Sequence, residues 1–331
     1  MIGYYIHHHG YGHLARAVSI SAQLRRPVTA LTSRTVSHPH PFTEIVNLPR
    51  DDAAAVVSEP TAHGALHWAP HHDHGYGARM RALARWVADA QPEACVVDVS
   101  VEVAIFLRLL GVPVIVVALP GERTDAAHVL VHRVADHILA AWPAALNSPH
   151  WLLPHAHKTS YVGGISRFEG RTRSTALYDH SGTSKVLLLG GAGGGLGDAT
   201  PELHDVTWRV IGGDAGPWIA DPWTEICAAD VVVSHAGQNS IADLAAAGRP
   251  AVIIPQPRPF GEQQATAEVL SRHGLAVTSA VWPSRDSWPD VLRRARAVDT
   301  SRWRHWQVQD AAARAAHAIE NTATRCRAAA S

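Results

Sequence analysis

The chain has 331 residues, of which 47% are hydrophobic and 18% are charged, so its length and composition predict two globular domains and exclude a disordered chain. Its 29 Lys and Arg residues equal its 29 Asp and Glu residues in number, which argues against nucleic acid as a partner. Three dispersed cysteines and no apolar run of about 20 residues favour a cytoplasmic protein without disulfides, a signal peptide or a transmembrane segment.

Apolar strands alternate with helical patterns in the first half of the chain. Strands are predicted at 1–6, 27–31, 44–48, 94–97 and 112–117, and helices at 14–24, 79–90, 101–110 and 126–140. The alternation predicts a parallel sheet, because parallel strands need crossover connections. Segment 63–77 is rich in His, Gly and Pro without a usable period, and we expect it to be a mobile loop.

A polar stretch rich in Gly, Ser and Thr divides the chain. The N-terminal domain is predicted to cover 1–164, with an exposed linker at 165–184. The second domain, 185–307, repeats the alternation, with strands at 185–189, 207–211, 231–234 and 251–254 and helices at 239–247 and 263–273. Another helix is expected at 308–326, within a C-terminal segment 308–331. These elements predict an α/β protein with two Rossmann-like, doubly wound parallel-sheet domains that face a cleft.

The turn between the strand at 231–234 and the following helix is suited to bind an anion. Unpaired backbone N–H groups and the helix dipole both favour phosphate at such a helix start. Gly237, Asn239 and Ser240 occupy this turn, where a diphosphate would lie. Spacing alone leaves open the alternative that Asn239 and Ser240 only cap the helix.

The longer segment 231–270 resembles the donor-binding signature of the GT-B glycosyltransferases, both the MurG-like family 28 enzymes and the UDP-glycosyltransferases. The family pattern His-Gly-Gly-x-Asn-Ser, followed by an acidic residue, appears here as HAGQNSIAD. The resemblance implies that His235, Asn239 and Ser240 hold the diphosphate. It also implies that Asp243 contacts the ribose hydroxyls in place of the family's Glu.

Further donor contacts follow from the same resemblance. Glu262 and Gln263 correspond to the family's acidic-Gln pair, which binds hydroxyls of the donor sugar. The chain departs from the pattern where Ala236 replaces a Gly, where Asp243 is shorter than Glu, and where Thr266 replaces the Asn of MurG-like enzymes. These departures predict that ribose and donor-sugar contacts differ from those of the family.

A Gly-rich run and a tryptophan complete the expected donor side. Gly191, Gly193 and Gly194 lie in the run GGAGGGLG, where glycines let a phosphate approach the backbone. This run resembles the first Gly loop of the second domain in MurG-like enzymes. By resemblance, Trp218 is the candidate for stacking on the nucleobase, with Trp223 as the alternative. Either tryptophan could instead serve only in packing.

A candidate catalytic base lies in the first domain. His13 opens the helix that follows the first strand, and Asp98 ends a later strand of the same predicted sheet. A carboxylate beside an imidazole fixes its tautomer and raises its basicity, which deprotonation of a hydroxyl requires. The two residues resemble the His-Asp pair of plant-type UDP-glycosyltransferases. The alternative is that His13 is a capping or solvent-facing residue.

Histidine-rich segments at 7–9 and 71–74 raise the question of a metal site. Adjacent histidines on a strand point to opposite faces, so three in a row would not bind one ion together. We therefore expect no metal ligands and no cofactor.

Together the patterns predict an inverting, metal-independent glycosyltransferase that moves a sugar from a UDP- or dTDP-sugar to a hydroxyl group. The expected partners are this nucleotide-diphosphate sugar and an acceptor of open identity, with peripheral membrane contact if the acceptor is lipid-linked. A nucleotide-sugar hydrolase or epimerase on the same fold is one alternative. A catalytically silent nucleotide-sugar-binding protein is another.

Overall fold

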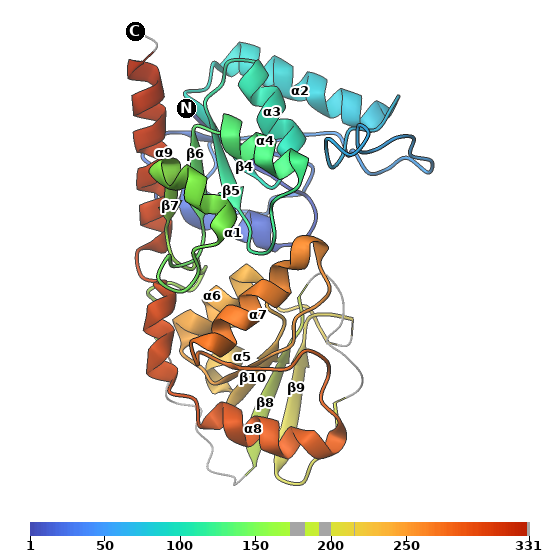
Figure 1. Ribbon diagram of the computed structural model, residues 1–331. Coiled ribbons are helices and arrows are strands. Elements are labelled where there is room, and N and C mark those ends of the chain that lie inside the picture. The colour runs from blue at the N-terminus through green and yellow to red at the C-terminus, as the bar shows by residue number, and fades with distance from the viewer. Residues whose placement is uncertain (173–182, 192–199, 215, 330–331) are drawn as a thin grey trace.

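The structure of the chain is a computed structural model that describes residues 1–172, 183–191, 200–214 and 216–329. Two α/β domains, each built on one β-sheet, lie one above the other in Figure 1. All strand pairs in both sheets are parallel. This architecture confirms the prediction of two parallel-sheet α/β domains. No helix among the described residues is long and apolar enough to cross a membrane.

Seven strands form the first sheet, in the order β3-β2-β1-β4-β5-β6-β7. Their bounds are β1 Ile2–Ile6, β2 Val28–Thr32, β3 Glu44–Asn47, β4 Ala94–Asp98, β5 Val114–Ala118, β6 His137–Ala140 and β7 Thr159–Tyr161. The central strands are buried along their whole length, as expected for parallel strands covered by helices on both faces. Ile6 pairs with Asp98 where the strand order reverses between β1 and β4. Such a reversal opens a crevice at the carboxyl ends of the strands.

Helices cover both faces of the first sheet. Their bounds are α1 Gly12–Ser21, α2 His74–Ala90, α3 Val101–Leu109, α4 Ala126–Val134 and α9 Ala311–Ala328. Leu83 of α2 and Leu107 of α3 belong to the core on one face, while Ile20 of α1 and Ile319 of α9 belong to the core on the other. Figure 1 shows α9, in red, alongside the first domain. The end of the chain therefore packs against its beginning.

Five strands form the second sheet, in the order β12-β11-β10-β8-β9. Their bounds are β8 Ser184–Leu189, β9 Val206–Ile211, β10 Val231–Ser234, β11 Ala251–Ile253 and β12 Val277–Thr278. The helices are α5 Trp223–Ala228, α6 Gln238–Ala247, α7 Glu262–Arg272 and α8 Trp288–Arg296. Leu244 of α6 and Leu270 of α7 belong to one core, and Trp288 and Leu292 of α8 belong to a second. The described 3-10 helices are η1 His150–Lys158, η2 Pro259–Gly261, η3 Arg285–Ser287 and η4 Thr300–Trp306.

Three local predictions were wrong. The helix predicted at 126–140 ends at Val134, and the buried strand β6 follows it. The loop predicted at 63–77 ends earlier, because the Asp73 side chain accepts a hydrogen bond from the Tyr76 backbone N–H and caps α2. The start of the predicted exposed linker is buried, since Ile165 packs in the first domain and Phe168 in the second. The rest of that linker, 173–182, lies outside the described residues.

Candidate active site between the two domains

The amino ends of α1 and α6 meet where the two domains face each other (Figure 1). The Asn239 side chain donates a hydrogen bond to the Gly12 backbone carbonyl over 2.9 Å. Arg16, one turn into α1, donates from Nη1 to Oε1 of Gln238 over 2.8 Å. Each helix follows a strand beside the order reversal of its own sheet. The two crevices expected at these reversals therefore open toward each other.

His13 and Asp98 are in direct contact on the first-domain side of this junction. Nδ1 of His13 lies 2.9 Å from Oδ1 of Asp98, and the Asp98 side chain is fully buried while that of His13 is 20% exposed. A carboxylate on Nδ1 holds the ring proton there, so Nε2 carries the lone pair that can accept a proton. The structure thus brings the two predicted residues together in the arrangement that a general base needs.

Arg16 is a third member of this cluster that the sequence reasoning missed. Its Nε donates to Oδ2 of Asp98 over 2.9 Å and its Nη2 to Oδ1 over 2.7 Å. Burial alone would raise the pKa of Asp98, but the charge of Arg16, with that of His13, holds this pKa below its usual range. Asp98 therefore stays ionised beside the imidazole. The i, i+3 spacing of His13 and Arg16 on one helix face was the available signal.

The predicted diphosphate residues lie at the start of α6. His235 follows β10, is buried, and its Nδ1 lies 2.9 Å from the Ile254 carbonyl oxygen. Gly237 is the residue before the first turn of α6, with extended backbone angles. Ser240 lies in the first turn of that helix, and the Asn239 side chain donates a hydrogen bond to the Gly12 carbonyl of the facing domain. Asn239 thus joins the domains as well as lying at the expected anion site.

Asp243 is buried against the segment that joins the domains. Its Oδ1 accepts a hydrogen bond from Ser166 Oγ over 2.7 Å, and its Oδ2 accepts one from Arg167 Nε over 3.2 Å. Burial raises the pKa of Asp243 to about 6 despite the opposing charge of Arg167. The carboxylate predicted to contact ribose is thus already hydrogen-bonded, and its ionisation is costly.

Glu262 and Gln263 have different roles in the structure. Gln263 is buried, and its Oε1 accepts hydrogen bonds from the backbone N–H groups of Ala236 and Gln256 over 3.1 and 2.9 Å. It therefore fixes the turn between β10 and α6. Glu262 is 23% exposed, and its Oε2 lies 3.6 Å from Nη2 of Arg123 in the first domain. Of this predicted pair, Glu262 has the more accessible carboxylate.

The two candidate tryptophans occupy opposite environments. Trp218 is 53% exposed, and its ring packs edge-on to that of Tyr11 at 5.5 Å between centroids. Trp223 is buried against Phe168 in the core of the second domain. Packing accounts for Trp223, whereas Trp218 presents a ring beside the loop that leads into α1. Of the predicted glycines, Gly191 follows β8, and Gly193 and Gly194 lie outside the described residues.

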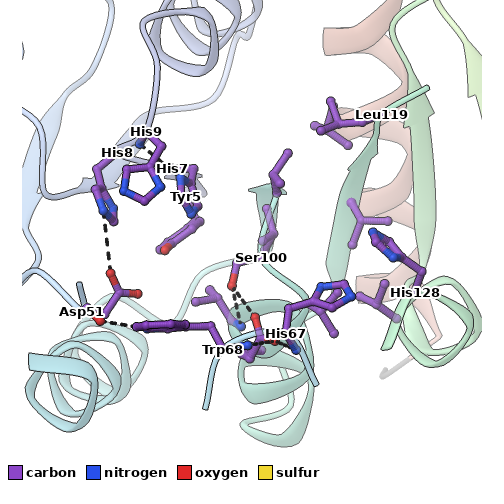
Figure 2. A pocket seen from close by; sticks show the side chains of 18 of the residues that line it. Tyr5, His7, His8, His9, Asp51, His67, Trp68, Ser100, Leu119 and His128 are labelled. Carbon is purple, nitrogen blue, oxygen red and sulfur yellow. Dashed lines mark hydrogen bonds and ion pairs between the residues drawn. The ribbon is translucent and has the colours of Figure 1, made fainter. Parts of the chain in front are cut away.

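A cavity of about 270 Å³ opens in the first domain beside the His13 cluster. Figure 2 shows Tyr5, His7 and Trp68 on its walls, together with apolar side chains from the strand ends. The His7 ring lies 5.8 Å from the His13 ring, measured between centroids. Loop 63–77, predicted to be mobile, contributes His67 and Trp68 to this cavity, which the sequence did not predict because its lining comes from segments far apart in the chain.

Solved structures of other proteins align with both domains of the chain. Solved structures of MurG from Acinetobacter baumannii and of UGT2 from Phytolacca americana cover 97% and 98% of the chain, and each match covers 99% of the solved chain. Their TM-scores are 0.62 and 0.65, at 17% and 16% sequence identity. The chain has the GT-B fold.

Part of the second domain is similar in sequence to family 28. Residues 220–280 match the glycosyltransferase family 28 C-terminal domain. A relative from Cupriavidus metallidurans, named UDP-N-acetylglucosamine–N-acetylmuramyl-(pentapeptide) pyrophosphoryl-undecaprenol N-acetylglucosamine transferase, is 29% identical over 51% of the chain and 53% of that protein. One of the same name from Sorangium cellulosum is 27% identical over 81% and 80%. The chain thus spans about half the length of several relatives that it matches.

The family 28 match contains most of the predicted donor residues of this GT-B protein. His235, Gly237, Asp243 and Gln263 all lie within it, and Trp218 lies two residues before it. His13 and Asp98 lie far outside it, in the first domain. The matched segment thus includes predicted donor residues and neither His13 nor Asp98.

Proposed function

We propose that this GT-B protein is a glycosyltransferase that moves a sugar from a UDP- or dTDP-sugar to a hydroxyl group of an acceptor held in the first domain. The His13–Asp98 contact carries the proposal, because α1, which holds His13, also contacts the start of α6. It places a proton acceptor on one side of the junction and an anion site on the other. The named activity of the family 28 relatives supports the same reaction class.

In the proposed reaction, Nε2 of His13 removes the proton of the acceptor hydroxyl. That oxygen attacks the anomeric carbon, and the bond from this carbon to the diphosphate oxygen breaks with inversion of configuration. Backbone N–H groups at the start of α6, with His235 beside them, stabilise the charge on the leaving diphosphate. These groups belong to the chain, so we propose that no metal ion takes part in the step.

The acceptor is proposed to occupy the cavity beside His7. Tyr5 and Trp68 give the cavity aromatic walls, and valines from the ends of β4 and β5 give it an apolar floor. An acceptor held there would direct a hydroxyl group toward His13, whose ring is 5.8 Å from that of His7. Binding of the non-reacting part of the acceptor would then orient the reacting oxygen.

Turnover of the His13→Ala variant tests the proposal. Loss of a general base is expected to lower kcat by about 10²–10⁴-fold, while UDP affinity, measured by calorimetry, stays near the wild-type value. His317→Ala serves as the matched control, because His317 is exposed on α9 and its ring contacts Asn321 of the same helix. Wild-type turnover in His13→Ala would remove His13 from the mechanism.

The reaction products separate transfer from the rival activities. Proton NMR of the anomeric centre should show the opposite configuration in product and donor sugar. Free sugar released without an acceptor, at the rate of transfer, would instead indicate a hydrolase. Tight UDP-sugar binding without turnover against lipid-linked, phenolic and carbohydrate acceptors would indicate a binding protein.

A further inference from the structure

A second cluster of ionisable side chains lies at the rim of the cavity, apart from the His13 contact. His8 and His9 follow the end of β1 at Ile6, in irregular backbone before α1. Their side chains therefore converge, whereas the alternation expected for a strand would have separated them. Nε2 of His8 and Nε2 of His9 lie 3.1 and 2.9 Å from the same oxygen, Oδ2 of Asp52.

The spacing of these three atoms is close to that of ligands around one small cation. Zn²⁺ binds imidazole nitrogen and carboxylate oxygen at about 2.0–2.1 Å, so neighbouring ligand atoms of a tetrahedral site lie roughly 3.3 Å apart. The observed separations of 2.9 and 3.1 Å need only a small expansion. Oδ1 of Asp51 lies 3.9 Å from Nε2 of His8, within reach of the remaining position.

The burial of the ligands suits a preformed site. The His8 side chain is 4% exposed and stacks on His7, with the ring planes 10° apart and the centroids 4.9 Å apart. Its orientation is thus fixed before an ion binds. Asp52 is 22% exposed and His9 is 64% exposed, so an ion can enter from solvent and His9 can close over it.

Two arginines already contact the carboxylates of the site, and Arg79 contacts the same Asp51 oxygen that faces His8. Arg79 pairs with Asp51 at 3.0 Å, and Arg50 donates from Nη2 to Oδ2 of Asp52 over 2.6 Å. Arg50 also donates from Nε to Oδ1 of Asp52 over 2.9 Å, but its side chain is 59% exposed, so it can turn into solvent when an ion binds. A dication would replace this contact and bring one more positive charge to two carboxylates.

We propose that His8, His9 and Asp52, with Asp51 as a fourth ligand, bind one divalent transition-metal ion such as Zn²⁺. Two imidazoles and one or two carboxylates are a ligand set that such ions prefer over Mg²⁺ or Ca²⁺. The site lies on the cavity wall (Figure 2) and does not include His13. None of its ligands takes part in the proposed proton transfer, so failure of the metal site would not remove His13 from the mechanism.

A similar cluster elsewhere on the cavity wall provides a contrast. Asp125 contacts Nε2 of His67 through one oxygen and Nδ1 of His128 through the other, and it also caps α4. Arg123 lies 3.4 Å from Nε2 of His128, and Phe260 packs against both imidazoles. The cation and the covering ring oppose a metal there, so this cluster serves as the matched control.

Competition with a chromogenic zinc chelator, on full-length protein freed of metal with EDTA, tests the proposal. Wild type should bind one tight equivalent of Zn²⁺, and Co²⁺ should give the intense visible bands of a tetrahedral site. His9→Ala and Asp52→Asn should each weaken binding by about tenfold or more, whereas His128→Gln should retain it. Circular dichroism checks that each variant is folded. His9→Ala should disturb the fold least, because the His9 side chain is exposed.

Arg50→Met gives the most specific test, because a cluster with a purely structural role would not bind Zn²⁺ more tightly in this variant. Removing the competing cation should tighten Zn²⁺ binding severalfold. Unchanged or weaker binding in Arg50→Met would overturn the proposal. So would a tight equivalent that survives in His9→Ala and Asp52→Asn, or a wild-type Co²⁺ spectrum with only the weak bands of an octahedral ion.

Discussion

Replacing Asp98 with Asn tests whether the buried ion pair with Arg16 supports the fold as well as the site. The Asp98 side chain is fully buried and that of Arg16 is 3% exposed, with 2.7 Å between Oδ1 and Nη2. Asp98→Asn leaves the Arg16 guanidinium buried without its counter-charge, and breaking such a pair from one side costs about 3–5 kcal/mol. Arg16→Met should cost a similar amount, because it leaves the Asp98 carboxylate buried with only His13 beside it.

The double variant Asp98→Asn/Arg16→Met distinguishes the interaction between the two residues from the effect of removing each one alone. It buries neither charge alone, so its loss of unfolding free energy should be smaller than the sum of the two single losses by about 2 kcal/mol or more. Urea unfolding at pH 7 measures all four proteins. Additive losses, within about 0.5 kcal/mol, would refute the reasoning. Transfer activity should be low in the two variants that carry Asp98→Asn, because His13 then loses the carboxylate that holds its tautomer.

Three further predictions concern other parts of the site. Because the pKa of Asp243 is raised to about 6 from 3.8, its contribution to stability is present below pH 4 and is lost as pH rises through 6. The unfolding free energy of wild type relative to Asp243→Asn should therefore fall by about 3 kcal/mol between these pH values. A difference that stays constant with pH would contradict this prediction. Trp223→Ala should cost about 3–5 kcal/mol in urea unfolding, whereas Trp218→Ala should change stability by less than about 0.5 kcal/mol and weaken UDP binding in calorimetry; unchanged UDP affinity would remove Trp218 from the donor site. Gly121 has φ +96°, and a Cβ there would lie 2.2 Å from the Phe260 carbonyl oxygen, so Gly121→Ala should open this contact between the domains, and small-angle scattering should show a larger radius of gyration.

Much of the fold could be predicted because parallel strands buried on both faces leave a simple pattern. The runs at 94–97 and 112–117 are continuous apolar stretches, and the structure has β4 and β5 there. The strand β6 could not be separated from α4 in the same way, because a short apolar run has no period that distinguishes strand from helix. Its pairing between β5 and β7 decides its conformation. In α8 the signal was present but unused, since Trp288, Val291, Leu292 and Ala295 recur at helical spacing and are buried.

The candidate site likewise contains some contacts that could be predicted from the sequence and others that could not. The approach of His13 to Asp98 could be predicted, because adjacent parallel strands bring their carboxyl ends to one edge and β1 pairs with β4. The partners of Asp243 could not, because Ser166 lies 77 residues away and has no motif that links it to α6. The convergence of His8 and His9 on Asp52 also depends on local backbone beyond the strand, which periodicity does not describe.

The position of α9 has a consequence for how the polypeptide matures. The sheet face that contains Ile2 and Tyr4 is completed by Ala315 and Ile319, which leave the ribosome about three hundred residues later. Until then this apolar face is covered only in part, by residues such as Leu14 and Ile20 of α1, whereas the second domain already has its own cores. The first domain thus precedes the second in the chain but is completed after it, so apolar surface of the first domain stays exposed to aggregation while the second domain folds.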